Sequence, residues 1–365
     1  MDTPTTQRLA SQVGGHAGVM TTEDGSLLIK PALPRELHFY QALQQDPALE
    51  VLREFTPKFL GTLKLEGKVD PAKTDNLAEA VLEPAGAEKD MYSVKSLRDR
   101  AADHCVRYLQ SLVLENLSFS FLKPNILDVK LGTVLYDETA PPEKVARMEK
   151  AARDTTSFEK GIRLTGFQVS LPIRAYFISN PSLRPIASQV YDNITSQPVN
   201  TPKAYGKSIK ASQLGEGIAK FFPVGLPEAE PSAEPTPSSG LPRETLVPVL
   251  RAIREEIEVI REAFASLELR MVGGSLLIIY EADWTRADEA IKQYLEGEEE
   301  EDEDEEGDEE EEESSKPKSG PPFTVKLIDF AHTSVVPGKG PDEGVLLGMD
   351  TVLNLLDARL AAITP

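Results

Sequence analysis

Cysteine is almost absent from this sequence, since Cys105 is the only one among 365 residues. A single cysteine cannot form an intrachain disulfide, and it excludes zinc sites built from several cysteine ligands. This composition favours a reducing compartment, where structural disulfides are rare. The role that fits Cys105 best is that of a small apolar side chain.

Long apolar runs are absent as well. No stretch of about 18 apolar residues occurs, so the sequence predicts no transmembrane helix. The first residues, MDTPTTQRLASQ, lack the apolar core of a signal peptide. Asn116 and Asn193 lie in glycosylation sequons, but we expect neither to be modified in a cytosolic or nuclear protein.

Positive charge is scarce overall, yet most of the imbalance lies in one acidic tract. The formal net charge is −21, and the tract that begins at Glu298 and ends at Glu313 holds 15 acidic residues in 16 positions. Removing these 15 negative charges from −21 leaves −6, so basic residues elsewhere can form a local positive site. Because like charges repel, we expect a disordered acidic insert over 296–322. A second disordered linker is expected over 225–242, which is rich in proline, serine and alanine.

The hydrophobic pattern predicts a mixed α+β fold with about two lobes. A chain of this length is long for one compact core. Strands are expected on both sides of a turn at residues 23–25, and in residues 55–67, 111–120, 165–179, 273–284 and 323–336. Helices are expected in residues 34–46, 141–160, 243–269 and 344–363, the third of them slightly perturbed by Pro248.

The segment KPNILDVKLG places Asp128 and Lys130 two residues apart in an apolar strand. Residues i and i+2 of a strand point to the same side, so the two charged groups are expected to project together. Such a pair can be a structural ion pair, which is the commoner case, or part of a site that handles a polyanion. The spacing alone leaves both interpretations open.

Four features occur in the order that a kinase requires. Lys30 ends a β-hairpin, LVLEN ends a strand where two lobes would join, DVKLG opens the second lobe, and Asp329 ends a late apolar strand. Kinases hold nucleotide phosphates with a lysine, adenine with hinge backbone, and Mg²⁺ with an aspartate. The H-R-D, A-P-E and G-x-G-x-x-G motifs of protein kinases are missing. The layout therefore predicts a kinase without the machinery that phosphorylates proteins.

PNILDVKLG resembles the P-x-x-x-D-x-K-x-G signature of the inositol polyphosphate kinase family. TVLYDETAPPEK, GSLLIIYE, LIDFAHT, DEGVLLG and YGKSIKASQLGEGIAKFF are similar to further segments of that family, and the first resembles its fungal multikinase branch. The resemblance implies a two-lobed kinase-like α+β fold, with a β-rich N-lobe (1–116), a larger C-lobe (117–365) and a helical substrate-binding segment (141–165). It also implies ATP- and Mg²⁺-dependent phosphorylation of inositol tris- and tetrakisphosphates.

The resemblance further implies roles for single residues. Those implied for the nucleotide and the metal are Lys30, Glu115, Leu117, Asp128, Ser275 and Asp329. Lys30 is expected at the ATP phosphates, and the backbone of Glu115 and Leu117 at adenine. Asp329 is expected to bind Mg²⁺, while Ser275 would lie on the nucleotide or metal side. No catalytic role is assigned to Glu36, because its short connection to Lys30 departs from the animal pattern.

The resemblance also implies roles for residues at the reaction centre. Lys130 is expected to face the transferred phosphate and the substrate, and His332 to contact the inositol phosphate. Asp128 is implied in ribose binding, although a carboxylate there can also orient the attacking hydroxyl.

The basic residues Lys144, Arg147 and Lys150 follow at intervals of three, near one face of the expected helix. These residues could form a solvated helix face, on which neighbouring glutamates balance their charge. They could instead bind a substrate with several negative charges. The resemblance favours the second interpretation, because the family binds inositol phosphate with the segment after the D-x-K motif. Arg174 and Lys207 are weaker candidates for the same pocket.

Two other functions fit the sequence. An inositol hexakisphosphate kinase would need a pocket more basic than the residues counted here. A transcriptional or chromatin scaffold would instead use the acidic tract to bind basic nuclear proteins. We expect the protein in the nucleus and the cytoplasm, and we expect no direct binding of nucleic acid.

Overall fold

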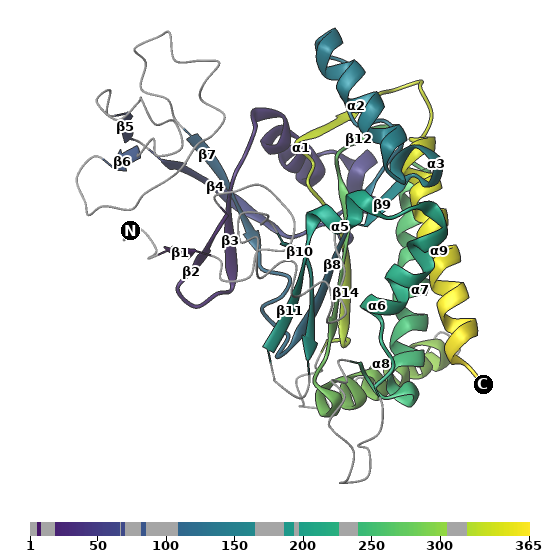
Figure 1. Cartoon of the computed structure of the whole chain (residues 1–365). Helices are drawn as coiled ribbons and strands as arrows, with labels where there is room; N and C mark the ends of the chain where they lie inside the picture. Colours follow the sequence, from purple (N-terminus) through teal and green to yellow (C-terminus); the bar gives the residue numbers. More distant parts are fainter. Residues whose placement is uncertain are drawn as a thin grey trace, which may run out of the picture.

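The computed structural model describes residues 6–8, 19–65, 67–69, 82–84, 109–164, 186–192, 197–225, 240–304 and 320–365. These residues form the predicted α+β kinase-like fold, with a β-rich N-terminal lobe and a larger C-terminal lobe (Figure 1). Within them, no helix is both long and apolar enough to span a membrane.

The N-terminal lobe is built on a five-stranded sheet in the order β1-β2-β3-β7-β4, antiparallel throughout. Its strands are β1 (Thr6–Arg8), β2 (Met20–Thr22), β3 (Leu27–Pro31), β7 (Leu109–Glu115) and β4 (Phe59–Leu65). Strands β5 (Gly67–Val69) and β6 (Leu82–Pro84) form a separate pair. The predicted hairpin around residues 23–25 is confirmed, and Lys30 lies near the end of its second strand.

Helix α1 (Pro34–Gln45) connects the N-terminal lobe to the other lobe through aromatic packing. Pro34 suits the first turn of the helix, where a backbone N–H would have no helical partner. The Phe39 ring stacks on Phe330 with centroids 4.5 Å apart, and Tyr40 meets the same ring edge-on at 5.6 Å. The 3₁₀ helix η1 (Pro47–Leu52) follows α1. Because Phe330 directly follows Asp329, this packing fixes α1 beside that residue.

The C-terminal lobe contains a sheet in the order β11-β10-β8-β13-β14, with β9 also paired to β8, and all of these pairs are antiparallel. Its strands are β11 (Gln197–Pro202), β10 (Ile186–Asp192), β8 (Pro124–Leu131), β13 (Ser275–Glu281), β14 (Phe323–Ile328) and β9 (Ile162–Leu164). The strands that contain Asp128, Ser275 and the approach to Asp329 are therefore neighbours. Their apolar side chains form a continuous core, in which Leu127 and Leu276 are fully buried.

Helices cover one side of this sheet (Figure 1). They include α6 (Leu214–Phe221), α7 (Arg243–Ala265) and α9 (Glu343–Ile363), while α8 (Trp284–Asp304) lies at one end. α7 continues through Pro248 and packs against α9, to which Arg254 and Arg261 form ion pairs. Shorter elements are α5 (Lys203–Ser208), η5 (Ala211–Gln213) and the strand pair β12 (Leu269–Val272) with β15 (His332–Val335).

The helical segment after β8 comprises α2 (Pro142–Asp154) and α3 (Ser157–Lys160). Gly161 ends α3 in the left-handed conformation with φ of 64°. A Cβ added there would lie 2.5 Å from the backbone nitrogen of Gly348 in α9. Glycine is needed at this position, because both the left-handed backbone and the close approach to α9 exclude a side chain. The segment is thus attached directly to the C-terminal helix.

Three expectations about segments are wrong. Residues 323–336 form two strands, β14 and β15, because the chain turns sharply at Asp329. The acidic tract is helical over 298–304, because α8 begins in folded structure and glutamate favours continuing a helix already formed. The linker expected over 225–242 has ordered ends, since Leu241 is buried and pairs with Val224. The strand expected over 165–179 lies outside the described residues.

Candidate functional site

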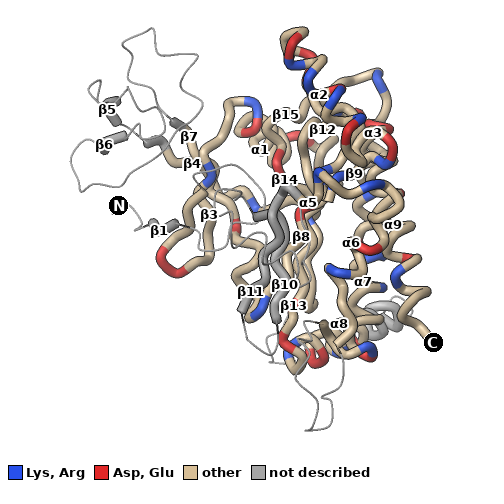
Figure 2. The backbone as a smooth tube through the Cα atoms, in the orientation of Figure 1, with Lys and Arg blue, Asp and Glu red and all other residues tan. Residues whose placement is uncertain are grey.

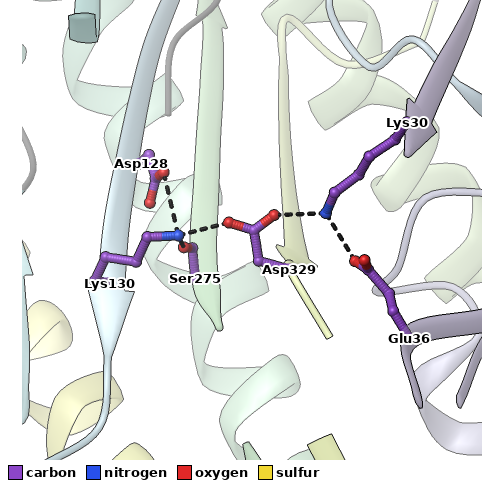
Figure 3. A network of polar contacts seen from close by, with 6 residues as sticks. All are labelled: Lys30, Glu36, Asp128, Lys130, Ser275 and Asp329. Atoms are coloured by element: carbon purple, nitrogen blue, oxygen red, sulfur yellow. Dashed lines mark hydrogen bonds and ion pairs between the residues drawn. The ribbon is translucent and has the colours of Figure 1, made fainter. Parts of the chain in front are cut away.

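Strands β3, β8 and β14 bring charged side chains together around Asp329, which directly follows β14. Its Oδ1 lies 2.8 Å from Nζ of Lys30 on β3, and its Oδ2 lies 2.6 Å from Nζ of Lys130 on β8. The two lysines come from different lobes, so this carboxylate joins the lobes electrostatically. Figure 3 shows the row of side chains, with Glu36 at one end and Asp128 at the other. Only 8% of the Asp329 side chain is exposed, so water screens these pairs weakly.

The backbone at Asp329 explains why its carboxylate points between the lysines. Its φ is 68°, the left-handed conformation, which aspartate adopts more readily than most residues. The strand therefore ends at Ile328, and Asp329 leaves the direction of β14 before β15 begins at His332. Phe330 is fully buried against α1 and holds the turn in place.

Glu36 pairs with Lys30 despite the short connection between them. Its Oε1 lies 2.7 Å from Lys30 Nζ, and Glu36 is 1% exposed. Because α1 begins at Pro34, Glu36 falls in the first turn and faces β3. The reservation that the sequence raised about this pairing is therefore wrong.

Asp128 and Lys130 project to the same side of β8, as their spacing predicts. Their side chains approach to 3.6 Å, and Lys130 Nζ also donates to Oγ of Ser275 at 2.6 Å. Ser275 lies directly opposite Lys130 in the register of β13 and β8. Asp128 and Ser275 are fully buried, whereas the Lys130 side chain is 19% exposed. Lys130 is thus the group of this trio that can meet a ligand.

Electrostatics keep Asp329, Lys30 and Lys130 charged at neutral pH. Burial alone would raise the pKa of Asp329, but Lys130 and Lys30 outweigh burial and hold the pKa far below its usual range. Burial would lower the pKa of Lys30, but Asp329 and Glu36 reverse this and raise it. Burial acts in the same way on the pKa of Lys130, which Asp128 and Asp329 raise. The charges of Asp329 and the two lysines therefore depend on one another.

Arg163 is a residue that the sequence analysis missed. It lies on β9 directly opposite Lys130, and burial lowers the pKa of its guanidinium while the charge of Asp128 acts against this. Asp128 thus lies within the influence of two cations. The signal was weak, because a three-residue strand in GIRLTG does not stand out from its surroundings.

The predicted hinge residues lie where the chain passes from β7 to β8. Glu115 is the last residue of β7, and Leu117 begins the turn that follows. The Glu115 carboxylate accepts the backbone N–H of Lys58 at 2.8 Å, and its own N–H donates to the Lys58 carbonyl at 3.1 Å. These bonds fix the end of the strand from one side.

Two polar side chains hold the hinge at its ends. The Asn116 amide donates to the Gly25 carbonyl at 2.7 Å, which ties the turn to the β2–β3 hairpin. At the other end the buried carboxylate of Glu281 accepts the backbone N–H groups of Leu122 and Lys123, at 2.8 and 2.9 Å. The connection between the lobes is consequently a defined structure that can present backbone groups to a ligand.

A second cluster lies beyond Asp329, around His332. Nδ1 of His332 is 2.7 Å from Oδ2 of Asp137, a residue of the loop between β8 and α2. A cavity of about 340 Å³ opens here. Its lining includes Arg35, Tyr136, Asp137, Arg270, His332 and Lys339. The cavity thus offers groups of both charge signs, which suits a ligand that carries hydroxyls and anionic groups.

The basic residues of α2 are exposed to different degrees. Lys144 is half-buried. The pKa of Asp137 is lowered mainly by the hydrogen bond from Thr139, and the charge of Lys144 adds to this effect. Arg147 is exposed, and Lys150 is bonded to Asp154 at 2.6 Å. None of the three lines the 340 Å³ cavity. Figure 2 shows both charge signs along α2, so this helix is not uniformly basic.

The two weaker candidates were Lys207 and Arg174. Lys207 is exposed on α5, and Arg174 lies outside the described residues.

A divalent cation fits this site together with a nucleotide. Among the described residues, no group of three or more histidine, cysteine, aspartate or glutamate side chains is placed to hold a metal alone. Mg²⁺ needs only one or two carboxylates when phosphates supply further oxygens. Asp329 can be that carboxylate. Its two oxygens lie at the ammonium groups of Lys30 and Lys130, which nucleotide phosphates would also attract.

Comparison with known proteins gives consistent matches. A family model described as inositol polyphosphate kinase matches residues 111–357. The chain is 32% identical to the inositol polyphosphate multikinase of Saccharomyces cerevisiae, over 97% of this chain and 99% of that protein. It is 24% identical to inositol hexakisphosphate kinase 1 of Rattus norvegicus, over 67% of this chain and 51% of that protein.

A solved structure is also similar over nearly the whole chain. It is the crystal structure of inositol phosphate multikinase Ipk2 from S. cerevisiae in complex with ADP and Mn²⁺. The TM-score is 0.55 at 26% identity, and the match covers 92% of this chain and 100% of that chain.

Replacing Asp329 should destabilise the fold, because Lys30 and Lys130 would then face each other without a shared counter-ion. We expect Asp329→Asn to lower the free energy of unfolding by about 3 kcal/mol or more, measured by urea denaturation. Asn also adopts positive φ, so backbone strain adds little. The matched control is Asp154→Asn, which removes an exposed lysine partner at the same 2.6 Å and should cost under about 0.5 kcal/mol.

The loss should be constant between about pH 5 and about pH 9. The stability from Asp329 is present above its unfolded pKa and is lost as pH falls through the lowered folded value. The stability from the lysines is present below their unfolded pKa and is lost as pH rises through the raised folded values. Equal losses for the two variants would show that the row contributes no more than a surface pair.

Proposed function

The chain belongs to the inositol polyphosphate kinase family, and from this premise we propose that it is an ATP-dependent inositol polyphosphate multikinase. Its proposed substrates are inositol tris- and tetrakisphosphates. The observation that carries the proposal is the shared carboxylate of Asp329, held between Lys30 of one lobe and Lys130 of the other. Two cations beside a carboxylate that could bind a metal support the transfer of a phosphate between two ligands at this position.

The nucleotide is proposed to bind between the lobes. Lys30 would hold its phosphates, with Glu36 keeping the ammonium group in place. Backbone groups of Glu115 and Leu117 would bind adenine at the hinge. Mg²⁺, bound by Asp329 and the phosphates, would neutralise charge on the transferred group. Supporting this, the S. cerevisiae structure that resembles this chain contains ADP and Mn²⁺.

Lys130 is the proposed stabiliser of the moving phosphate. Its ammonium group is partly exposed and is held by Ser275, Asp128 and Asp329. A cation fixed before the reaction stabilises developing charge without the cost of reorganisation. The full burial of Asp128 favours a role in holding Lys130 over direct contact with ribose or with the attacking hydroxyl.

The inositol phosphate is proposed to bind between the His332 cavity and helix α2. Lys144 and Arg147 would supply charge-assisted hydrogen bonds to its phosphates. Lys150 is the weaker member of the three, because Asp154 already neutralises it. Mixed acidic and basic groups in the cavity would bind the ring hydroxyls.

Two further proposals concern partners and location. The acidic tract suits binding of basic nuclear proteins through long-range attraction, and a nuclear and cytoplasmic location would be consistent with it. The alternative activity, an inositol hexakisphosphate kinase, has weaker support, because the chain is 24% identical to hexakisphosphate kinase 1 but 32% identical to the S. cerevisiae multikinase.

Turnover on a panel of inositol phosphates tests the proposed function. With Mg²⁺ and ATP, purified protein should phosphorylate tris- and tetrakisphosphates and leave the hexakisphosphate unchanged. Lys130→Met and Asp329→Asn should each lower kcat at least about a hundredfold. The control Asp357→Asn, on the outer surface of α9, should stay within about twofold. Product from the hexakisphosphate alone would favour the alternative, and no product at all would refute both.

Neutralising the exposed face of α2 tests the proposed substrate site. Arg147→Gln should raise KM for the inositol phosphate about tenfold and leave KM for ATP nearly unchanged. The effect should shrink at high salt, because screened charges contribute less. Arg153→Gln is the matched control on the same helix, since Arg153 is occupied by Glu149 and lies over the Phe158 ring. Equal effects on both substrates would indicate a structural role for α2.

A further inference from the structure

The Asp137 carboxylate uses its two oxygens for two different purposes. Oδ1 accepts hydrogen bonds from the backbone N–H and the hydroxyl of Thr139, at 2.9 and 2.5 Å. Oδ2 lies 2.7 Å from Nδ1 of His332. The first oxygen orders the loop after β8, and the second reaches across to the strand that follows Asp329. Asp137 therefore links two chain segments that both leave the reaction centre.

The contact with Asp137 determines which nitrogen of His332 is available to a ligand. An ionised carboxylate only accepts hydrogen bonds, so the proton must lie on Nδ1 of the imidazole. The Asp137 side chain is 9% exposed, and hydrogen bonds from Thr139 help to lower its pKa, so it is ionised at neutral pH. Nε2 is then the nitrogen left for the cavity that His332 lines.

We propose that Asp137 is a positioning residue, which orients His332 so that Nε2 faces the bound inositol phosphate. The identity of this ligand rests on the proposed function, whereas the orientation of the ring does not. With a neutral ring Nε2 accepts a hydrogen bond from a ring hydroxyl, and with a protonated ring it donates to a phosphate. Holding the ring in advance avoids the cost of ordering it when the ligand binds.

Kinetics of Asp137→Asn test this role against a purely structural one. KM for the inositol phosphate should rise about tenfold, while KM for ATP and kcat stay within about threefold. The control Thr139→Ala removes a hydrogen bond from Oδ1 and leaves Oδ2 with His332, so its KM should stay within about twofold. If both variants raise KM equally, the loop alone accounts for the effect and the proposal fails.

A double-mutant comparison asks whether Asp137 acts through His332. In the His332→Ala background, Asp137→Asn should change KM for the inositol phosphate by less than about twofold, because the residue it positions is already gone. A further tenfold rise in that background would overturn the proposal.

Nitrogen-15 NMR of the imidazole rings gives a readout that needs no substrate. The chain has four histidines, and the signal missing in His332→Ala identifies His332. In the wild-type protein at neutral pH, Nδ1 of His332 should carry a proton, and Asp137→Asn should lower its protonated fraction. A wild-type ring protonated on Nε2 alone would overturn the proposal, even if the variant fails to fold. Inactivity of the wild type on inositol phosphates would instead refute the proposed function and leave the NMR result standing.

Discussion

The bridge that Asp329 makes between Lys30 and Lys130 is the interaction on which the rest of the site depends. The two ammonium groups would repel each other without it, and each comes from a different lobe. Their burial makes the shared carboxylate necessary, because an unpaired buried charge is far more costly than a paired one. Glu36 then accepts a hydrogen bond from Lys30 and Ser275 accepts one from Lys130, while Asp128 forms an ion pair with Lys130 (Figure 3).

The bridge in turn depends on one unusual backbone position and on the order of strands. Antiparallel pairing of β14 with β13, and of β13 with β8, brings the end of β14 beside Lys130. The positive φ of Asp329 then directs its carboxylate between the lobes and turns the chain toward His332. Phe330, packed on Phe39 and Tyr40, couples this turn to the helix that contains Glu36. Core packing and the geometry of the ion pairs around Asp329 are thus set by the same few residues.

Much of the site was predictable where a periodic pattern or a motif specified it. Strand alternation placed Asp128 and Lys130 on one face, and the hairpin and apolar strand located Lys30 and Asp329 correctly. The break at Asp329 was not predictable, because no glycine or proline marks the turn. The partnership of Asp137 with His332 and the approach of Arg163 to Asp128 depend on tertiary contacts between distant segments. The helical start of the acidic tract was missed because charge repulsion was weighed without the helix that precedes it.

If Asp329 binds the metal as proposed, Lys30 and Lys130 compete with the metal for its carboxylate until nucleotide phosphates attract them away. Titration of nucleotide-free protein with Mn²⁺, followed by electron paramagnetic resonance, tests this directly. Removing either competitor, in Lys30→Met or Lys130→Met, should tighten Mn²⁺ binding about tenfold, by analogy with the loss of one charge-assisted hydrogen bond. Asp329→Asn, as the control, should abolish binding at the site. Wild-type protein that binds Mn²⁺ as tightly as both lysine variants would contradict the proposal that the two lysines compete with the metal for Asp329.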